Sequence, residues 1–194
     1  MLTARFSHDG RTLGTAGEDC VASIWKRAET PLPERQLIVT ASAFKVVLDS
    51  SDQLAAVADI DGQVQLWNLE DGNLEDGNKA NGKLSHPRRV NSMFFSTNGQ
   101  QLVSECSDGI LRCWDIQTLS AREIALGSSV ESLALSHDGH RFLIDCEDSK
   151  MRHIGRDSLE SIGPALEHST GILPVAYSPL VGMRGCANGE FCPR

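Results

Sequence analysis

The sequence of 194 residues predicts an all-β chain in which one unit of four short strands occurs four times and begins a fifth time. Two observations carry this prediction. Tryptophans occur at long, nearly regular intervals, at positions 25, 67 and 114. Between them, short apolar runs alternate with polar turns that contain Asn-Gly or Asp-Gly, a strong short-range signal for β-hairpins. No segment shows a sustained helical period, so we expect no helices.

The repeats align in register when each is written to end just after its tryptophan. They read FSHDGRTLGTAGEDCVASIWK (6–26), LDSSDQLAAVADIDGQVQLWN (48–68), FSTNGQQLVSECSDGILRCWD (95–115) and LSHDGHRFLIDCEDSKMRHIG (135–155). In the last of these Ile154 takes the tryptophan position. Six residues before each such position stands an aspartate: Asp19, Asp61, Asp108 and Asp148. A residue type that recurs in otherwise unlike copies indicates a role in every repeat, here in a tight turn.

The repeats occupy approximately residues 1–30, 36–72, 83–119 and 121–160, with a partial, degraded copy at 166–194. The interval from Trp67 to Trp114 is five residues longer than that from Trp25 to Trp67. The sequence Asn-Leu-Glu-Asp-Gly occurs twice in succession in residues 68–77, which accounts for the difference. We interpret it as a tandem insertion in a surface loop, where added residues cost little free energy.

Four strands in about 40–45 residues, closed by a Trp-Asp dipeptide, resemble the WD40 blade. Trp114-Asp115 is the full dipeptide, whereas Trp25-Lys26 and Trp67-Asn68 keep only the tryptophan. The resemblance extends over residues 1–178 and implies a β-propeller segment of four blades and part of a fifth. The chain also resembles bacterial WD40 arrays that are fused to Ser/Thr kinase or NTPase domains.

The same resemblance implies a structural tetrad in the third copy, formed by His86, Ser104, Asp108 and Trp114. An aspartate in a tight turn can accept hydrogen bonds from backbone N–H groups and from an imidazole, which links to a hydroxyl and an indole N–H. Such a network satisfies polar atoms that are costly to bury. Asp19, Trp25, Asp61, Trp67 and Asp148 are the equivalent positions elsewhere, and His168 matches the tetrad histidine in the fifth copy.

The alternative is that Ser104, His86 and Asp108 form a hydrolytic triad. A triad needs a cleft, an exposed nucleophile and an oxyanion hole. The aspartate occurs in every full copy, whereas other copies have Val57, Ile144 or Leu126 in place of its partners. The pattern therefore favours the structural role, and we expect no catalysis.

Composition excludes several functions. Lys plus Arg number 18 against 26 Asp plus Glu, a net charge of −8, which disfavours nucleic-acid binding and polybasic membrane binding. The six cysteines include no Cys-x-x-Cys pair, and no His or Cys spacing fits a metal site. No P-loop, GxGxxG or HExxH motif occurs, so no cofactor is expected. Without a signal-peptide core or a membrane span, the expected location is the cytoplasm, with reduced thiols.

The sequence therefore predicts a protein–protein interaction scaffold. Variable loops on a rigid ring present contact residues, and Arg88 and Arg89, beside the tetrad histidine, are the candidate contacts. A regulatory propeller within a larger kinase or NTPase is the alternative. The array starts on the first strand of a repeat and stops within the fifth copy, so we expect an open arc or fragment whose uncovered ends favour self-association.

Overall fold

The computed structural model describes residues 3–7, 10–26, 35–69, 79–96, 98–136, 138–156 and 158–167. Outside these ranges lie His8, His137, His168, Cys186, Cys192, all but the first two residues of the fifth copy, and most of the duplicated pentapeptide. The described residues form sixteen strands and no helix, and therefore contain no helix able to cross a membrane. This confirms the all-β prediction.

The strands form four antiparallel sheets of four strands, and in each sheet the spatial order follows the chain. The first sheet contains β1 (Thr3–Phe6), β2 (Thr12–Ala16), β3 (Val21–Lys26) and β4 (Arg35–Ile38). The second contains β5 (Ala43–Leu48), β6 (Leu54–Asp59), β7 (Gln63–Asn68) and β8 (Lys79–Ser85). The third contains β9 (Val90–Phe95), β10 (Gln101–Cys106), β11 (Ile110–Asp115) and β12 (Ala121–Ala125). The fourth contains β13 (Val130–Leu135), β14 (Arg141–Cys146), β15 (Lys150–Gly155) and β16 (Leu166–Glu167).

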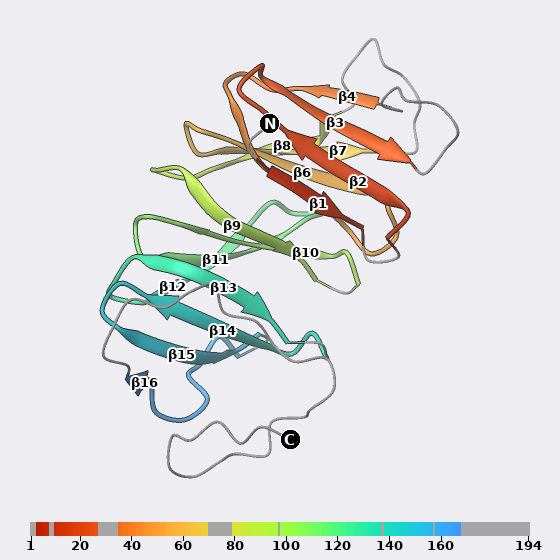
Figure 1. Cartoon of the computed structure of the whole chain (residues 1–194). Coiled ribbons are helices and arrows are strands. Elements are labelled where there is room, and N and C mark those ends of the chain that lie inside the picture. The colour runs from red at the N-terminus through yellow and green to blue at the C-terminus, as the bar shows by residue number, and fades with distance from the viewer. Residues whose placement is uncertain are drawn as a thin grey trace, which may run out of the picture.

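The four sheets stack face to face in chain order, as the blades of a propeller do (Figure 1). The first strands β1, β5, β9 and β13 are innermost, because each packs against the first strand of the adjacent sheet. Apolar side chains fill the three junctions between neighbouring described sheets, so the described part of the chain has three separate cores and no single central one. The described sheets form an arc that does not close on itself (Figure 1).

The turn between the second and third strands has the same conformation in every sheet. Trp25, Trp67 and Trp114 lie on β3, β7 and β11, and the aspartate six residues before each lies in the preceding turn. The next residue has a positive φ in all four sheets, although its identity varies: Cys20, Gly62, Gly109 and Ser149. Cys20 and Ser149 take up a backbone conformation that side chains disfavour, which indicates that the surrounding sheet imposes this turn.

The turn between the first and second strands is closed by a buried polar residue. In three sheets it is a serine whose hydroxyl accepts a hydrogen bond from the N–H of the residue five positions later, as Ser96 does from Gln101 at 2.9 Å. In the second sheet Asp49 replaces the serine and accepts from the Leu54 N–H at 2.8 Å. These side chains satisfy backbone donors that the hairpin would otherwise leave unpaired.

The sheets are offset from the sequence repeats. The repeats that begin near residues 36 and 121 open on β4 and β12, and each of these strands pairs with the third strand of the preceding sheet. The second, third and fourth repeats therefore each supply the outer strand of one sheet and the three inner strands of the next.

Cys20, Cys106, Cys113 and Cys146 are unpaired thiols. The last three are buried in the junctions between sheets, and burial raises the pKa of Cys113 and Cys146 to about 11. Protonated, buried thiols pack as small apolar groups.

Candidate functional site

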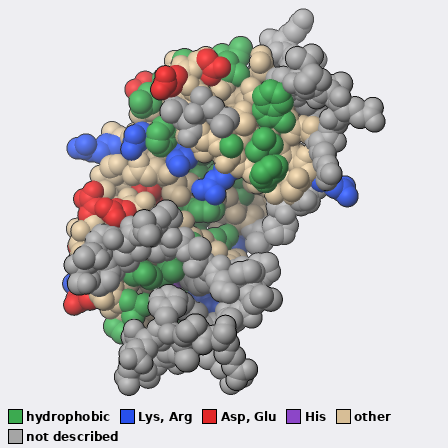
Figure 2. Space-filling view, viewed as in Figure 1, with side chains coloured by type: hydrophobic (Ala, Val, Ile, Leu, Met, Phe, Trp, Pro, Cys, Tyr) green, Lys and Arg blue, Asp and Glu red, His purple; other side chains and the backbone are tan. Residues whose placement is uncertain are grey.

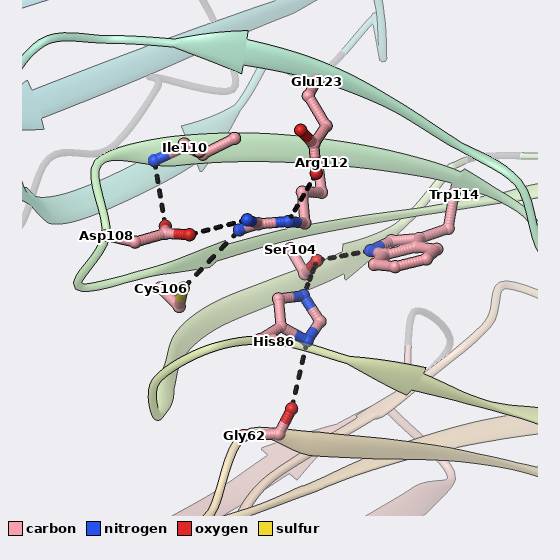
Figure 3. Close-up of polar contacts among 9 residues, drawn as sticks. All are labelled: Gly62, His86, Ser104, Cys106, Asp108, Ile110, Arg112, Trp114 and Glu123. Carbon is pink, nitrogen blue, oxygen red and sulfur yellow. Dashed lines mark hydrogen bonds and ion pairs between the residues drawn. The ribbon is translucent and has the colours of Figure 1, made fainter.

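A chain of hydrogen bonds centred on Ser104 connects the second and third sheets (Figure 3). The Trp114 indole N–H donates to the Ser104 hydroxyl at 2.8 Å, and that hydroxyl lies 2.7 Å from Nε2 of His86. Nδ1 of His86 lies 3.2 Å from the carbonyl oxygen of Gly62. Because a carbonyl can only accept, Nδ1 carries the proton and Nε2 accepts from Ser104. The pKa of His86 is lowered, chiefly by burial, which keeps the imidazole neutral for this arrangement.

Asp108 takes a different place from the one predicted. It does not hydrogen-bond to His86, and its carboxylate accepts from the Ile110 N–H at 3.1 Å and from Nη2 of Arg112 at 2.6 Å. Burial opposes ionisation of Asp108, but the bonds from Arg112, Cys106 and Ile110 outweigh it and lower its pKa. The prediction of a direct imidazole–carboxylate link was therefore wrong, because Arg112 takes the carboxylate and Gly62 takes the imidazole.

This geometry does not provide the hydrolytic triad considered above. The Ser104 side chain is fully buried and already accepts from Trp114, so substrate has no access to it. His86 is also buried, and the group that orients it is the backbone carbonyl of Gly62 in the second sheet. A serine nucleophile requires exposure and a carboxylate-oriented base, and these three residues offer neither.

The other sheets retain only parts of the hydrogen-bonded chain. In the first sheet Thr15 holds the Ser104 position and accepts from the Trp25 indole at 2.9 Å. In the second sheet that position is Val57, and the buried indole nitrogen of Trp67 has no hydrogen-bond partner among the described residues. In the fourth sheet both positions are apolar, with Ile144 and Ile154 packed in the core. Among the three indoles of the described sheets, only that of Trp67 in the second sheet is left without an acceptor.

We expect Val57→Thr to stabilise the chain by about 1 kcal/mol, because a threonine hydroxyl would accept from the Trp67 indole as Thr15 does from Trp25. Thr15 donates in turn to the carbonyl of Ser23 at 3.4 Å, so a hydroxyl at this position can act both as an acceptor for the indole and as a donor to the backbone. Urea unfolding followed by circular dichroism measures the effect.

Ile144→Thr is the matched control, because the fourth sheet has Ile154 in place of the tryptophan and offers no indole donor. This variant should lower the free energy of unfolding by about 1–2 kcal/mol, as expected for a buried hydroxyl that lacks one hydrogen-bond partner. If both threonine variants lose stability by the same amount, then giving the Trp67 indole an acceptor does not stabilise the chain.

Sequence reasoning missed the two arginines that bind the turn aspartates. Arg112 and Arg152 stand two residues before the tryptophan position of the third and fourth repeats, and each bonds to the aspartate four residues earlier. The hydrogen bond from Arg152 lowers the pKa of Asp148, as Arg112 does for Asp108. The Asp-x-x-x-Arg spacing, present twice, was the available signal.

Arg88 and Arg89, the predicted contacts, lie exposed in the turn that joins β8 to β9. A Cβ atom on Gly62 would overlap the carbonyl oxygen of Arg88, so this glycine lets the β8–β9 turn pack on the β6–β7 turn. The Arg89 guanidinium lies over the ring of Phe44, with its central carbon 4.3 Å from the ring centroid. Figure 2 shows Lys and Arg side chains gathered near the start of β9, beside this turn.

Glu105 lies beneath this group and is fully buried. Its Oε1 accepts from Asn91 at 3.2 Å, whereas Oε2 has no hydrogen-bond partner among the described residues. Burial raises the pKa of Glu105 to about 7, against the opposing effects of Asn91 and Lys45. Phe44 and Asn91 occupy β-bulges at the starts of β5 and β9, and bulges commonly redirect side chains beside functional sites. Nothing in the sequence identified Glu105, since it stands in an ordinary strand.

Four stacked four-stranded sheets with a Ser–His–Trp network define a WD40-type propeller segment. The sequence model described as "WD domain, G-beta repeat" matches residues 79–115, which are β8 to β11 and include His86, Ser104 and Trp114. The third repeat is thus a WD40 repeat, and the other three sheets share its strand order and turn geometry.

Several curated proteins are similar to most of this chain. The chain is 27% identical over 166 residues to the small ribosomal subunit protein RACK1 of Caenorhabditis elegans, an alignment that covers 78% of this chain and 49% of the relative. It is 24% identical to the transcriptional corepressor LEUNIG_HOMOLOG of Arabidopsis thaliana, covering 92% and 22% respectively. It is 24% identical to autophagy-related protein 16 of Arabidopsis thaliana, covering 84% and 31%. The chain therefore matches about half, or less, of the length of each of these relatives.

Proposed function

We propose that this chain is a non-catalytic scaffold that binds protein partners through the face formed by the β8–β9 turn and the neighbouring β6–β7 and β10–β11 turns. The observation that carries the proposal is the exposed pair Arg88 and Arg89 on a rigid support. The turn is held by Gly62, by the His86–Ser104 bond and by the core beneath it. Binding residues are commonly loop residues fixed by such a support.

The relatives support a scaffold over an enzyme. Their names place them in a ribosomal subunit, in transcriptional corepression and in autophagy. Proteins from three such different settings are similar to this chain, which favours presentation of a surface over one common reaction. Neither these names nor the described residues favour the kinase or NTPase alternative. Among the described residues no group of His, Cys, Asp and Glu is placed to hold a metal ion.

We also propose that the partner is a protein and that the chain acts in the cytoplasm. The net charge of −8 opposes binding to the phosphate backbone of a nucleic acid. The four described cysteines remain unpaired, as thiols do in a reducing compartment. Fractionation of cells that express the tagged chain tests the location.

Affinity capture with the charge-reversed variant Arg88→Glu/Arg89→Glu tests the interface. We expect the amount of each protein captured by the unmodified chain to fall about tenfold or more in this variant. The two substitutions remove two arginine contacts and add negative charges that repel an acidic partner surface. The matched control is Lys83→Glu/Arg122→Glu, which makes the same charge change on the exposed outer strands β8 and β12.

Equal capture by both double variants would mean that the interface lies elsewhere. Failure of the unmodified chain to capture any protein would contradict the scaffold function itself.

A further inference from the structure

The inference concerns the chemistry of the partner and rests on the scaffold function proposed above. Three cationic side chains converge from three adjacent sheets. Arg5 is on β1, Lys45 is on β5, and Arg89 immediately precedes β9. The strands β1 and β9 both pack against β5, so Lys45 lies between the other two. We call these three residues, together with the exposed Arg88 of the same turn as Arg89, the cationic cluster.

The charges of the cluster affect one another. The pKa of Lys45 is lowered, first by burial and then by the positive charges of Arg5 and Arg89, while the negative charge of Glu105 opposes the change. Like charges held this close raise the free energy of the unbound surface, and an anion between them would lower it.

Phe44 supports the cluster from below. Its ring lies under the Arg89 guanidinium, and Nζ of Lys45 is 5.4 Å from the same ring centroid. Nε of Arg89 also donates to Asn91 Oδ1 at 3.3 Å. A cation held over an aromatic face loses part of its conformational freedom before any ligand arrives. The cluster is thus partly ordered in advance of binding.

No surface carboxylate among the described residues neutralises these cations. In the described part of the chain, none of the four cluster residues forms an ion pair, whereas Arg112, Arg141 and Arg152 each pair with an aspartate. The acid that acts on Lys45 is Glu105, which is fully buried and has one oxygen without a partner. In a chain with a net charge of −8, an unneutralised cationic cluster is a local exception.

We propose that the cationic cluster binds a short acidic segment of a partner protein, through carboxylate or phosphoserine side chains. Arginine is suited to this because its guanidinium can donate two parallel hydrogen bonds to a carboxylate or a phosphate. A long polyanion fits less well, because four cations neutralise only a few phosphates and the acidic remainder of the surface repels the rest.

Fluorescence anisotropy with three labelled peptides tests the proposal: hexaglutamate, a phosphoserine peptide of the same length, and hexaglutamine. We expect the first two to bind, to weaken as salt is raised, and to bind at least about tenfold more weakly to Lys45→Gln/Arg89→Gln. Hexaglutamine should not bind. Lys83→Gln/Arg122→Gln, with the same loss of charge on the outer strands, should bind as the unmodified chain does. Circular dichroism verifies that both variants fold.

Absence of binding by both acidic peptides, or equal weakening in the control variant, would overturn the inference. So would tighter binding of an RNA oligonucleotide or of phosphatidylserine vesicles. If the peptides fail but affinity capture still depends on Arg88 and Arg89, only the acidic chemistry of the partner is wrong. If capture also fails, the scaffold function is wrong as well.

Discussion

Replacement of Trp114 by alanine is expected to lower the free energy of unfolding by about 3–4 kcal/mol. The indole packs in the junction between the second and third sheets, and its ring lies edge-on to His86 with a centroid distance of 5.4 Å. It also donates to Ser104. The substitution therefore removes apolar contacts, opens a cavity and deprives a buried hydroxyl of one partner.

Trp25→Ala is the matched control for this loss. Trp25 occupies the equivalent position on β3 and donates to Thr15 in the same way, but it is not part of the described core clusters. Its face of the first sheet also carries the exposed Phe6 and Ile38, each 70% exposed. We expect a clearly smaller loss. Urea unfolding measures the free energy of unfolding of both variants, and hydrogen exchange locates the destabilised sheet. Equal losses of stability would show that packing between sheets is not the main contribution of Trp114.

Glu105→Gln is expected to stabilise the chain at about pH 8 by about 1–3 kcal/mol, and to lose that advantage below about pH 4.5. The pKa of Glu105 is about 7 in the folded chain, above its ordinary value of 4.5. The folded state therefore binds this proton more tightly than the unfolded state does. The carboxyl group is tolerated below its unfolded pKa, and stability is lost as the pH rises through the folded pKa.

Glutamine removes the charge and keeps an oxygen that can accept from Asn91. Urea unfolding at about pH 4 and about pH 8 separates the two regimes. Glu131→Gln is the control, because Glu131 is exposed on β13 and the substitution makes the same chemical change outside the core. A stabilisation of the same size at both pH values would mean that the glutamine acts through packing and not through the charge.

The sequence predicted those features that depend on local pattern. Apolar runs, Asp-Gly and Asn-Gly turns and the spacing of Trp25, Trp67 and Trp114 sufficed for the all-β fold and the number of described sheets. They sufficed because the turns and the pairs among the three inner strands of each sheet are formed within one repeat, and only the outer strand comes from the next. The pairing of Ser104 with His86 and Trp114 followed from the resemblance to WD40 repeats.

The remaining features depend on which neighbour an atom meets in space. Asp108 could accept from His86 or from Arg112, and the sequence contained both. Burial of Glu105 was not predictable, because both faces of the third sheet are covered by neighbouring sheets and alternation does not mark a solvent side. The approach of Arg5, Lys45 and Arg89 joins residues from three repeats, so no single repeat contains its signal.

The offset between repeats and sheets has a consequence for how such arrays change length. A repeat that is duplicated or deleted as a unit adds or removes one outer strand and three inner strands. The outer strand completes the sheet before it, and the following repeat completes the new sheet in the same way. Within the array, then, a change in copy number leaves every sheet with four strands. Adjacent sheets also stay linked, because one repeat contributes strands to both of them. Recombination between repeats can therefore alter the curvature and reach of the array without producing an incomplete blade in its interior.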